Sequence, residues 1–379
     1  MRNTKNSTVV TMIICAITFI VFVFCFLYYY EADVLTIAQH ELSKGQTHYN
    51  RTVGAFLITI VLGLFSWGMF RLTKLRKRTH ALVYFPALLT LAIISDVSQK
   101  VNEVFCFGAW TIIYPLLLII YGILVFFTIQ FQPYEPETHT FGYSPKILWI
   151  NLMQMGIMFI LVSLICNSNK IFHQRARVEV CLVNDDLNDA NEVISNIDKT
   201  DSSLTCLKAF VLSKQGKLGE SFFETPVTGG AESLLPNASS VKMLLYPKSK
   251  LYTYLGKEFK QYLSPLNYCE FCTLHHLDKP ALHDYYLVGL LMDKKLDKFV
   301  AEIGKYYPLD SSLPKHYREA LILYKHHRVN PKVLYHSSVM DADFADYQTL
   351  ERKYKNTIER KNAIRETFGT TYWYYWQYC

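Results

Sequence analysis

An uncharged stretch of 22 residues, Val9–Tyr30, constrains the fold more than any other feature of the chain. It reads VVTMIICAITFIVFVFCFLYYY. As a helix it would rise about 33 Å at ~1.5 Å per residue, enough to cross a hydrocarbon core of ~30 Å. The run is longer than the apolar part of a signal peptide and ends in tyrosines rather than at a small-residue cleavage site. We therefore expect an uncleaved membrane anchor.

The two halves of the chain differ in composition. Residues 1–166 contain 11 Lys/Arg and 7 Asp/Glu, whereas residues 167–379 contain 28 and 25. The first half is predicted to be a transmembrane domain and the second a soluble domain with its own core. The tail is nearly neutral and shows no basic face, so we expect no nucleic-acid partner.

Four further apolar segments are predicted to span the bilayer. They are residues 53–70, 81–97, 105–131 and 147–166. The third is the shortest, and Pro86 is expected to kink it. Asp96 stands at its far end, where an interfacial position is expected. The fold class is therefore all-α, with a bundle of five transmembrane helices before the soluble tail.

The basic loop RLTKLRKR between the second and third spans indicates the orientation. Basic side chains beside a span stay cytoplasmic, and they attract anionic lipid heads. With a cytoplasmic N-terminus, the cytoplasmic side carries eight Lys/Arg and the short outer loops carry three. Five crossings place the tail outside the cytoplasm, whereas failure of 81–97 to span would leave it inside. The residues of this basic clamp are Arg71, Lys74, Arg76, Lys77 and Arg78.

The tail is predicted to be a series of helix–turn–helix units. Polar turns are expected at Asn184–Asp186, Gln215-Gly216 and Asp293-Lys294, each followed by a leucine. The leucines Leu187 and Leu218 are 31 residues apart, close to the tetratricopeptide period, and Leu296 follows after 78. The pattern indicates a degenerate tetratricopeptide-like array, which would leave a surface free for a protein partner.

Two parts of the tail interrupt this pattern. Residues 224–250 contain three prolines and two glycines, and we expect a loop or flexible insert there. A last long helix is predicted over Phe344–Phe368, with Asp343 as its N-cap. The closing sequence TYWYYWQYC has two interpretations that stay open, docking on the membrane interface or packing onto the helices.

The stretch Tyr268–His276 contains the sharpest local pattern, a C-x-x-C followed by two histidines. Thiolate and imidazole suit a tetrahedral zinc ion, but the four groups are crowded into eight residues, whereas zinc ligands usually come from separate turns. On a helix, Cys269, Cys272 and His276 would share one face and pack in the core, which is the interpretation we favour. The zinc alternative would use Cys269, Cys272, His275 and His276. No cofactor is expected.

Glu31 and Asp33, just beyond the first span, are the only acids singled out for chemistry. Acids at this place could act as a base or hold a divalent metal in membrane glycosyltransferases that use lipid-linked sugars. The simpler expectation is a solvated loop start. No nucleotide-binding, zinc-protease or serine-hydrolase motif is present. Nine cysteines, with five in the tail, do not form a disulfide pattern.

Part of the tail resembles a known family. The segments YCEFCTLHHLDKPALHDYYLVGLLMDKKLDKFVAEIGKYYP, LPKHYREALILYKHH and LKAFVLSKQGKLGESFF are similar to the C-terminal half of a Bacteroidota membrane-protein family of unknown function. In that family a multi-span region precedes a helical-repeat tail. The resemblance covers nearly the whole tail and implies a bacterial inner-membrane location, with no catalytic residues to transfer.

These observations favour a non-enzymatic scaffold or envelope-assembly component, held in the bilayer and presenting a helical-repeat surface to a protein partner. The alternative is a membrane glycosyltransferase, or a shortened relative, that uses a lipid-linked sugar with Glu31 or Asp33 as its key acid. A channel or transporter is disfavoured because the predicted spans contain almost no ionisable residue beyond Asp96.

Overall fold

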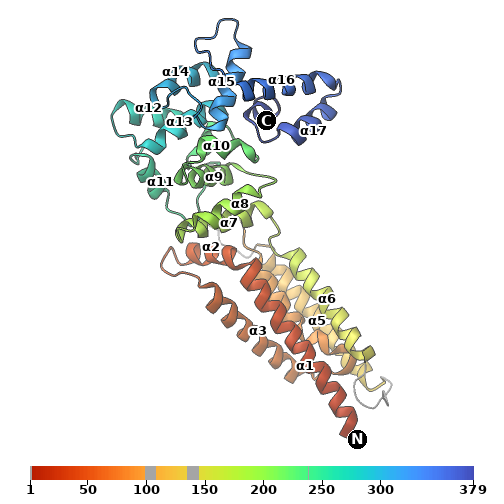
Figure 1. Ribbon diagram of the computed structural model, residues 1–379. Coiled ribbons are helices and arrows are strands. Elements are labelled where there is room, and N and C mark those ends of the chain that lie inside the picture. The colour runs from red at the N-terminus through yellow and green to blue at the C-terminus, as the bar shows by residue number, and fades with distance from the viewer. Residues whose placement is uncertain (1, 99–107, 135–144, 238) are drawn as a thin grey trace. The chain divides into compact units, whose positions relative to one another are not determined.

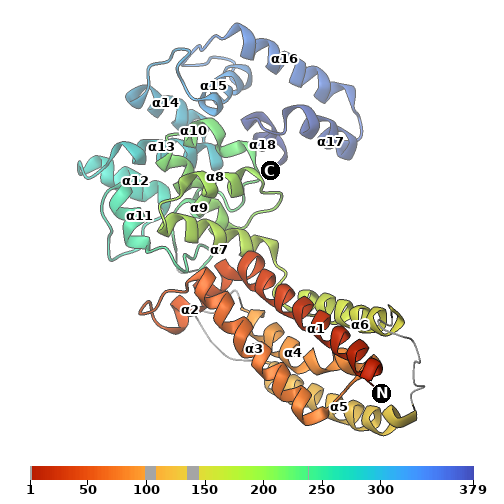
Figure 2. The same cartoon turned by 60° about the horizontal axis from the view of Figure 1, so that its bottom comes forward.

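The computed structural model describes residues 2–98, 108–134, 145–237 and 239–379. These described residues form helices joined by turns and irregular segments, with no strand among them. The chain divides into two compact units, Met1–His173 and Gln174–Cys379, close to the predicted boundary at residue 166. The first unit runs from red to yellow in Figure 1 and Figure 2, and the second from green to blue.

The first unit contains five helical segments that are long and apolar enough to cross a membrane. They are Val9–Tyr30, Arg51–Thr73, Lys77–Ser95, Trp110–Tyr134 and Pro145–Ile165, and each overlaps a predicted span. Residues 105–107 of the predicted fourth span lie outside the described residues. The elements are α1 (Arg2–Cys25), the π-helix η1 (Phe26–Tyr30), α2 (Ala32–Leu42), α3 (Arg51–Thr73), the 3₁₀ helix η2 (Lys77–Tyr84), α4 (Phe85–Ser95), α5 (Trp110–Phe131), η3 (Gln132–Tyr134) and α6 (Pro145–Ile165).

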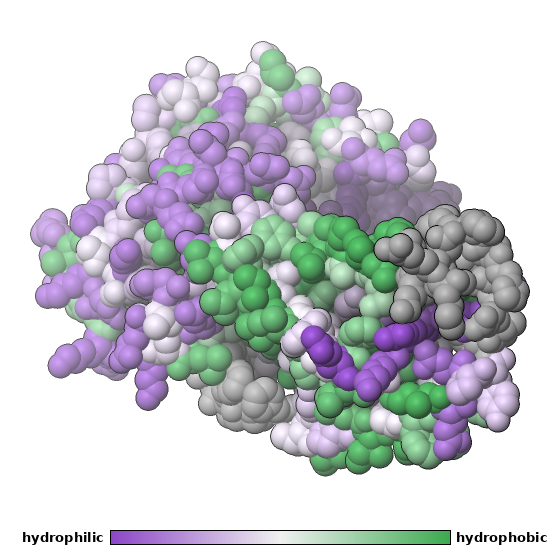
Figure 3. Space-filling view, turned by 90° about the horizontal axis from the view of Figure 1, so that it is seen from below, coloured by the Kyte–Doolittle hydropathy of each residue, from purple (hydrophilic) through white to green (hydrophobic). Residues whose placement is uncertain are grey.

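Each long helix buries one stripe and exposes apolar side chains elsewhere. Cys15, Phe19 and Val23 of α1 recur every four residues and are almost completely buried. The outward positions are apolar as well, and green patches of such side chains are visible on the surface in Figure 3. Outward apolar residues that are more than 60% exposed include Phe56, Leu64, Ile112, Phe131 and Leu164. Surfaces of this kind fit lipid hydrocarbon better than water.

The third segment combines two kinds of helix. The 3₁₀ helix η2 has eight residues and α4 has eleven. At ~2.0 Å and ~1.5 Å per residue they extend about 32 Å together, the thickness of a hydrocarbon core. The expectation that Pro86 kinks the helix is wrong, because this proline lies in the first turn of α4. Backbone N–H groups in the first turn have no hydrogen-bond partner within the helix, so a proline there breaks no helical hydrogen bond.

The second unit is a series of short helices. Its elements are α7 (Lys170–Val183), which begins in the first unit, α8 (Leu187–Ser195), α9 (Ser202–Lys214), α10 (Leu218–Ser221), η4 (Phe222–Glu224), η5 (Ala231–Leu234), α11 (Lys248–Leu255), α12 (Pro265–Leu274), α13 (Pro280–Met292), α14 (Leu296–Tyr306), α15 (Lys315–His327), α16 (Ser338–Lys353), α17 (Thr357–Phe368) and α18 (Tyr372–Tyr378). The core lies along α9, α13 and α15, most of whose residues are buried.

Four of the turns between these helices share one geometry. Asp185, Gly216, His276 and Lys294 each adopt a left-handed conformation, with φ between 54° and 68°. After each, the next N–H donates to a carbonyl five residues earlier, as Lys217 does to Leu212 at 2.8 Å. This is the Schellman ending of a helix. The three predicted turns are confirmed, and the 31- and 78-residue spacings recur between Asp185, Gly216 and Lys294. Assignment to the tetratricopeptide class stays a prediction.

Residues 224–250 are largely irregular, as the predicted loop requires, but they are packed rather than flexible. Its apolar side chains are buried, among them Ala231, Leu234, Val241 and Leu244. Glu179 fixes its backbone, since one carboxylate oxygen accepts from the N–H groups of residues 244, 245 and 246 at 2.9, 2.5 and 3.0 Å. A buried acid from α7 therefore replaces the pairing that a regular helix would supply.

The predicted helix Phe344–Phe368 is two helices, α16 and α17. The chain becomes extended at Tyr354, and the side chain of Asn356 caps α17 by accepting from the Ile358 N–H at 2.9 Å. Asp343 lies inside α16 rather than at its start, which corrects the predicted N-cap. Asp341 instead accepts from the N–H of the N-cap Ser337 at 3.3 Å. An asparagine that competes for backbone N–H groups thus divides an otherwise continuous helical pattern.

Candidate functional site

Glu31 is the most unusual ionisable residue of the first unit. The chain approaches it through the π-helix η1, whose wider turn is closed by the Glu31 N–H donating to Phe26 O at 3.0 Å. The Glu31 side chain is fully buried, and neither carboxylate oxygen has a hydrogen-bond partner among the described residues. Single π turns occur frequently at functional positions, and a buried acid without partners is costly. The two features together mark Glu31 as a candidate site residue.

The ends of α4 and α6 bring Asp96 and Cys166 near this acid. Asp96 ends α4 and accepts from the Trp110 indole N–H at 2.7 Å. Cys166 follows α6, is buried, and donates to Ser163 O at 3.2 Å. Ser95 is also buried, and its hydroxyl is without a hydrogen-bond partner among the described residues. The ends of α1, α4 and α6 thus form one polar end of an otherwise apolar bundle.

Burial raises the pKa of Glu31 to about 8. The neighbouring Cys166 thiol offsets part of this shift, whereas the negative charge of Asp96 adds to it. Glu31 therefore carries a proton at neutral pH and is suited to donate or accept one. The expectation of a solvated loop start is wrong for Glu31, because the chain continues directly into α2. The signal for α2 was the apolar periodicity of Val34, Leu35 and Ala38.

Asp33, the second acid singled out in the sequence, is not buried as Glu31 is. It lies in the first turn of α2 and is half-buried, and it makes an interaction of its own. The described residues contain no group of three or more His, Cys, Asp or Glu arranged to hold a metal ion. The chemistry supported at Glu31 is therefore proton exchange by one buried acid.

The cysteine–histidine stretch is divided between core and surface. Cys269 and Cys272 lie on α12 and are buried, as the core interpretation predicts. The helix ends at Leu274, so the expectation that His276 shares their face is wrong. His276 adopts the left-handed turn conformation, and it is exposed together with His275. The four side chains of the zinc alternative therefore face different environments.

What this stretch does expose is an apolar patch. Phe271, Leu274 and His275 share one face of α12, and Leu277 follows in the turn; we call these four residues the α12 patch. Leu274 is 75% exposed and Phe271 39%. The rings of Phe271 and His275 are in contact, tilted by 46° with their centroids 4.2 Å apart. The patch thus combines an aromatic pair with two leucines on a surface that is otherwise largely polar.

The basic clamp lies at the opposite end of the bundle from Glu31. It occupies the end of α3, the following turn and the start of η2. Arg71 lies over the Trp67 ring, with its guanidinium carbon 4.7 Å from the ring centroid. No ion pair joins the clamp to a carboxylate among the residues that the structure describes. None of the described carboxylates therefore neutralises these five positive charges.

Comparison with known proteins gives one match. Residues 264–379 match the model of a family described as "Family of unknown function (DUF6057)". The matched range includes the α12 patch and all helices from α13 to α18. It is shorter than the resemblance noted in the sequence, since the segment 207–223 lies outside it. No curated protein and no solved structure matches the chain.

Proposed function

We propose that this protein is an integral membrane scaffold whose helical tail binds a protein partner at the bilayer surface. Five helices long and apolar enough to span a membrane support the anchor. The α12 patch is the observation that supports the partner. Its side chains project from a unit whose other large apolar residues mostly lie in the core. Exposed apolar groups rimmed by polar residues are typical of protein interaction sites.

The composition of the patch favours a protein over a small ligand. Aromatic residues are enriched at protein interfaces, and the α12 patch presents Phe271 in ring contact with His275. Phe259 packs edge-on against Phe271 at 5.2 Å, which fixes the phenyl ring before any partner arrives. A rigid aromatic anchor loses little entropy on binding. The partner chemistry that fits is an apolar groove that accepts Phe271 and Leu274.

A photo-crosslinking amino acid at position 274 tests this proposal in intact cells. We expect a discrete adduct at position 274 and a weaker one at 277. The same substitution at Ile358, which is 72% exposed on α17, is the matched control and should give none. Leu274→Glu should then remove the adduct formed from position 277. Equal labelling at 274 and 358, or no adduct at any of the three positions, contradicts a specific partner on the α12 patch.

The proposal includes a bacterial inner membrane, a cytoplasmic N-terminus and a periplasmic tail. Eight basic residues on one side and three on the other support this orientation. A reporter active only in the periplasm, fused after Cys166, should give signal. A reporter fused within the 71–78 loop should give none. The reverse pattern would place the tail and its partner in the cytoplasm.

The glycosyltransferase alternative rests on Glu31, whose buried and unpartnered carboxyl suits a catalytic acid or base. Replacing Glu31 and Asp33 with alanine distinguishes the two functions. The scaffold proposal predicts unchanged crosslinking from position 274. The alternative predicts sugar transfer from a labelled lipid-linked donor in vesicles, lost in the double variant. Absence of transfer by the wild-type protein leaves the scaffold as the better account.

A further inference from the structure

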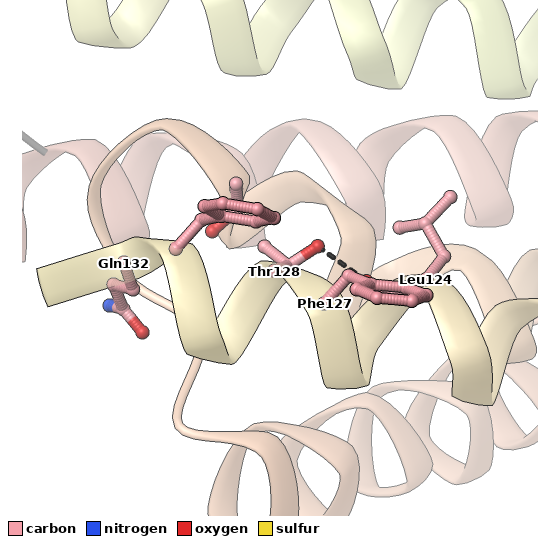
Figure 4. A pocket seen from close by; sticks show the side chains of 6 residues that line it. Leu124, Phe127, Thr128 and Gln132 are labelled. Carbon is pink, nitrogen blue, oxygen red and sulfur yellow. Dashed lines mark hydrogen bonds between the residues drawn. The ribbon is translucent and has the colours of Figure 1, made fainter. Parts of the chain in front are cut away.

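A groove opens on the lipid-facing side of the bundle at the end that carries the basic clamp. Its volume is about 340 Å³, and its walls come from η2 and the last turns of α5. Figure 4 shows Leu124, Phe127, Thr128 and Gln132 along one wall. Thr79 of η2 completes the lining together with Phe131. The volume lies at the lower end of the range for ligand pockets.

The groove is shallow, with an apolar floor of exposed α5 side chains and a polar mouth where that helix ends. Leu124 and Phe127 lie one to two turns before the end of α5, whereas Gln132 follows its end. Thr128 uses its hydroxyl within its own helix, donating to Leu124 O at 2.6 Å, so the wall there is effectively apolar. The groove is apolar along α5 and ends in the amide of Gln132. A phospholipid has the same order of groups, with apolar acyl chains followed by a polar headgroup.

Three clamp residues stand next to the mouth. Arg76, Lys77 and Arg78 directly precede Thr79, and the Thr79 hydroxyl donates to Arg76 O at 3.2 Å. The buried amide of Asn151 holds this segment in place by donating to Lys77 O at 2.8 Å. The backbone that carries three positive charges is therefore held beside the wall of the groove. Within the described residues no carboxylate forms an ion pair with these charges.

We propose that this groove binds one anionic phospholipid. An acyl chain lies along Leu124, Phe127 and Phe131, and the phosphate lies among Arg76, Lys77 and Arg78. Charge complementarity selects this occupant, since each basic side chain near a membrane surface favours anionic over neutral lipid by about fivefold. A zwitterionic lipid would fill the same floor and gain little from the clamp.

Competition between two lipids tests the proposal on the full-length protein. The protein, purified in detergent, is incubated with equal amounts of phosphatidylglycerol and phosphatidylcholine of identical acyl chains, and bound lipids are counted by native mass spectrometry. We expect one retained lipid, with phosphatidylglycerol at least fivefold in excess. Equal retention of the two lipids overturns the proposal. It does so whatever the cause, including neutralisation of the clamp by Glu135 and Glu137, which lie outside the described residues.

Two kinds of variant separate headgroup from chain. Arg76→Gln with Arg78→Gln should reduce the phosphatidylglycerol excess toward parity while one lipid stays bound. Thr128→Trp keeps every charge and fills the groove, so it should remove the retained lipid. Ile119→Trp, on the same helix at a position 61% exposed, is the matched control and should bind as the wild type does.

Each variant outcome decides the assignment. Retention of phosphatidylglycerol by Thr128→Trp at the wild-type level overturns the groove as the site. A dimer that Thr128→Trp dissociates would assign the groove to a second copy of the chain and overturn the lipid. If Thr128→Trp fails to fold, Leu124→Trp fills the same groove from one turn away and carries the same expectation.

Discussion

The side-chain oxygen of Asn151 accepts a hydrogen bond from the backbone N–H of Ala81, 70 residues earlier, at 2.8 Å. The amide nitrogen of Asn151 donates to Lys77 O and to Ile147 O, each at 2.8 Å. Asn151 is fully buried in α6. It therefore satisfies two backbone groups of the 3₁₀ helix η2 where hydrocarbon offers no substitute. We therefore expect this side chain to stabilise the eight residues of 3₁₀ helix in the third apolar segment.

Replacing Asn151 with leucine should destabilise the bundle by about 2–4 kcal/mol, because two buried backbone groups lose their partners. The measurement is thermal unfolding in detergent. Ser66→Ala is the matched control, since the buried Ser66 hydroxyl only donates to Leu62 O within its own helix. We expect that control to change stability by less than about 1 kcal/mol. Similar losses for both variants would show that Asn151 does not hold η2.

The five long apolar helices could be predicted because hydrophobic length is a local property of the sequence. The third span was placed at 81–97, whereas the helical segment is Lys77–Ser95. Two features of the first unit that were not predicted depend on residues far apart in the chain. The 3₁₀ winding needs Asn151, which stands 70 residues away. The burial of Glu31 needs the π turn of η1 and the neighbours Asp96 and Cys166, and no periodicity in the sequence encodes that convergence.

Glu319 joins the last helix to the core of the second unit. Its carboxylate accepts from the Tyr372 N–H at 2.7 Å and from the ring of His316 at 2.8 Å. The other ring nitrogen of His316 accepts from the Phe223 N–H at 3.1 Å, which assigns the His316 proton to the side facing Glu319. Tyr372 and Tyr375 in turn donate to the last carbonyls of α13. The aromatic C-terminal sequence therefore packs onto the helices, which was one of the two interpretations of its sequence.

Glu319→Ala should release α18 and cost about 3–5 kcal/mol, because it leaves the buried Nδ1–H of His316 and the buried Tyr372 N–H without partners. Trp373, only 2% exposed, reports the release as a red shift of tryptophan fluorescence at low denaturant. Asp297→Ala removes an exposed ion pair to Arg328 and should cost no more than about 1 kcal/mol. An unchanged emission spectrum for Glu319→Ala would contradict the assigned role of Glu319.

Three of the four left-handed turns could be predicted because each carries a local marker, a polar or glycine residue two positions before a leucine, whereas His276 was expected to be helical. The packing of residues 224–250 could not, since Glu179, which pairs their N–H groups, lies on α7. Asn356 gave a local signal for the break between α16 and α17, but the mixed charges around it resemble a continuous solvated helix. Failures of prediction in this chain thus cluster where a distant polar side chain replaces regular backbone pairing.

Gly219 marks the closest approach of α10 to α15. A methyl group at this position would lie 2.7 Å from the Tyr317 ring and 2.9 Å from Pro314. Tyr317 is fully buried and cannot move away easily. Gly219→Ala should therefore destabilise the protein by about 1–3 kcal/mol through overpacking. Gly304→Ala, on α14 with no atom within 4 Å, should be neutral or stabilising by up to about 1 kcal/mol. Chemical denaturation of both variants measures the difference, and an equal response would refute the tight α10–α15 contact.

The buried carboxyl of Glu31 predicts how stability depends on pH. Its pKa rises from 4.5 in the unfolded chain to about 8 in the folded protein, chiefly through burial. The folded state therefore holds the proton more tightly, and the contribution of Glu31 to stability is lost as pH rises from about 4.5 through about 8. Each pKa unit corresponds to about 1.4 kcal/mol, so the loss amounts to a few kcal/mol.

Glu31→Gln keeps the shape of the protonated acid and removes its titration. We expect the variant to match the wild type at pH 5 and to unfold at a higher temperature than the wild type at pH 9. Glu366→Gln, at an exposed position of α17, is the matched control and should follow the wild-type curve. Parallel curves for Glu31→Gln and the wild type from pH 5 to 9 would mean that Glu31 is already ionised when folded. A cation or an amine held beside Asp96 would then have to balance its charge, because a buried carboxylate without a partner is too costly to persist.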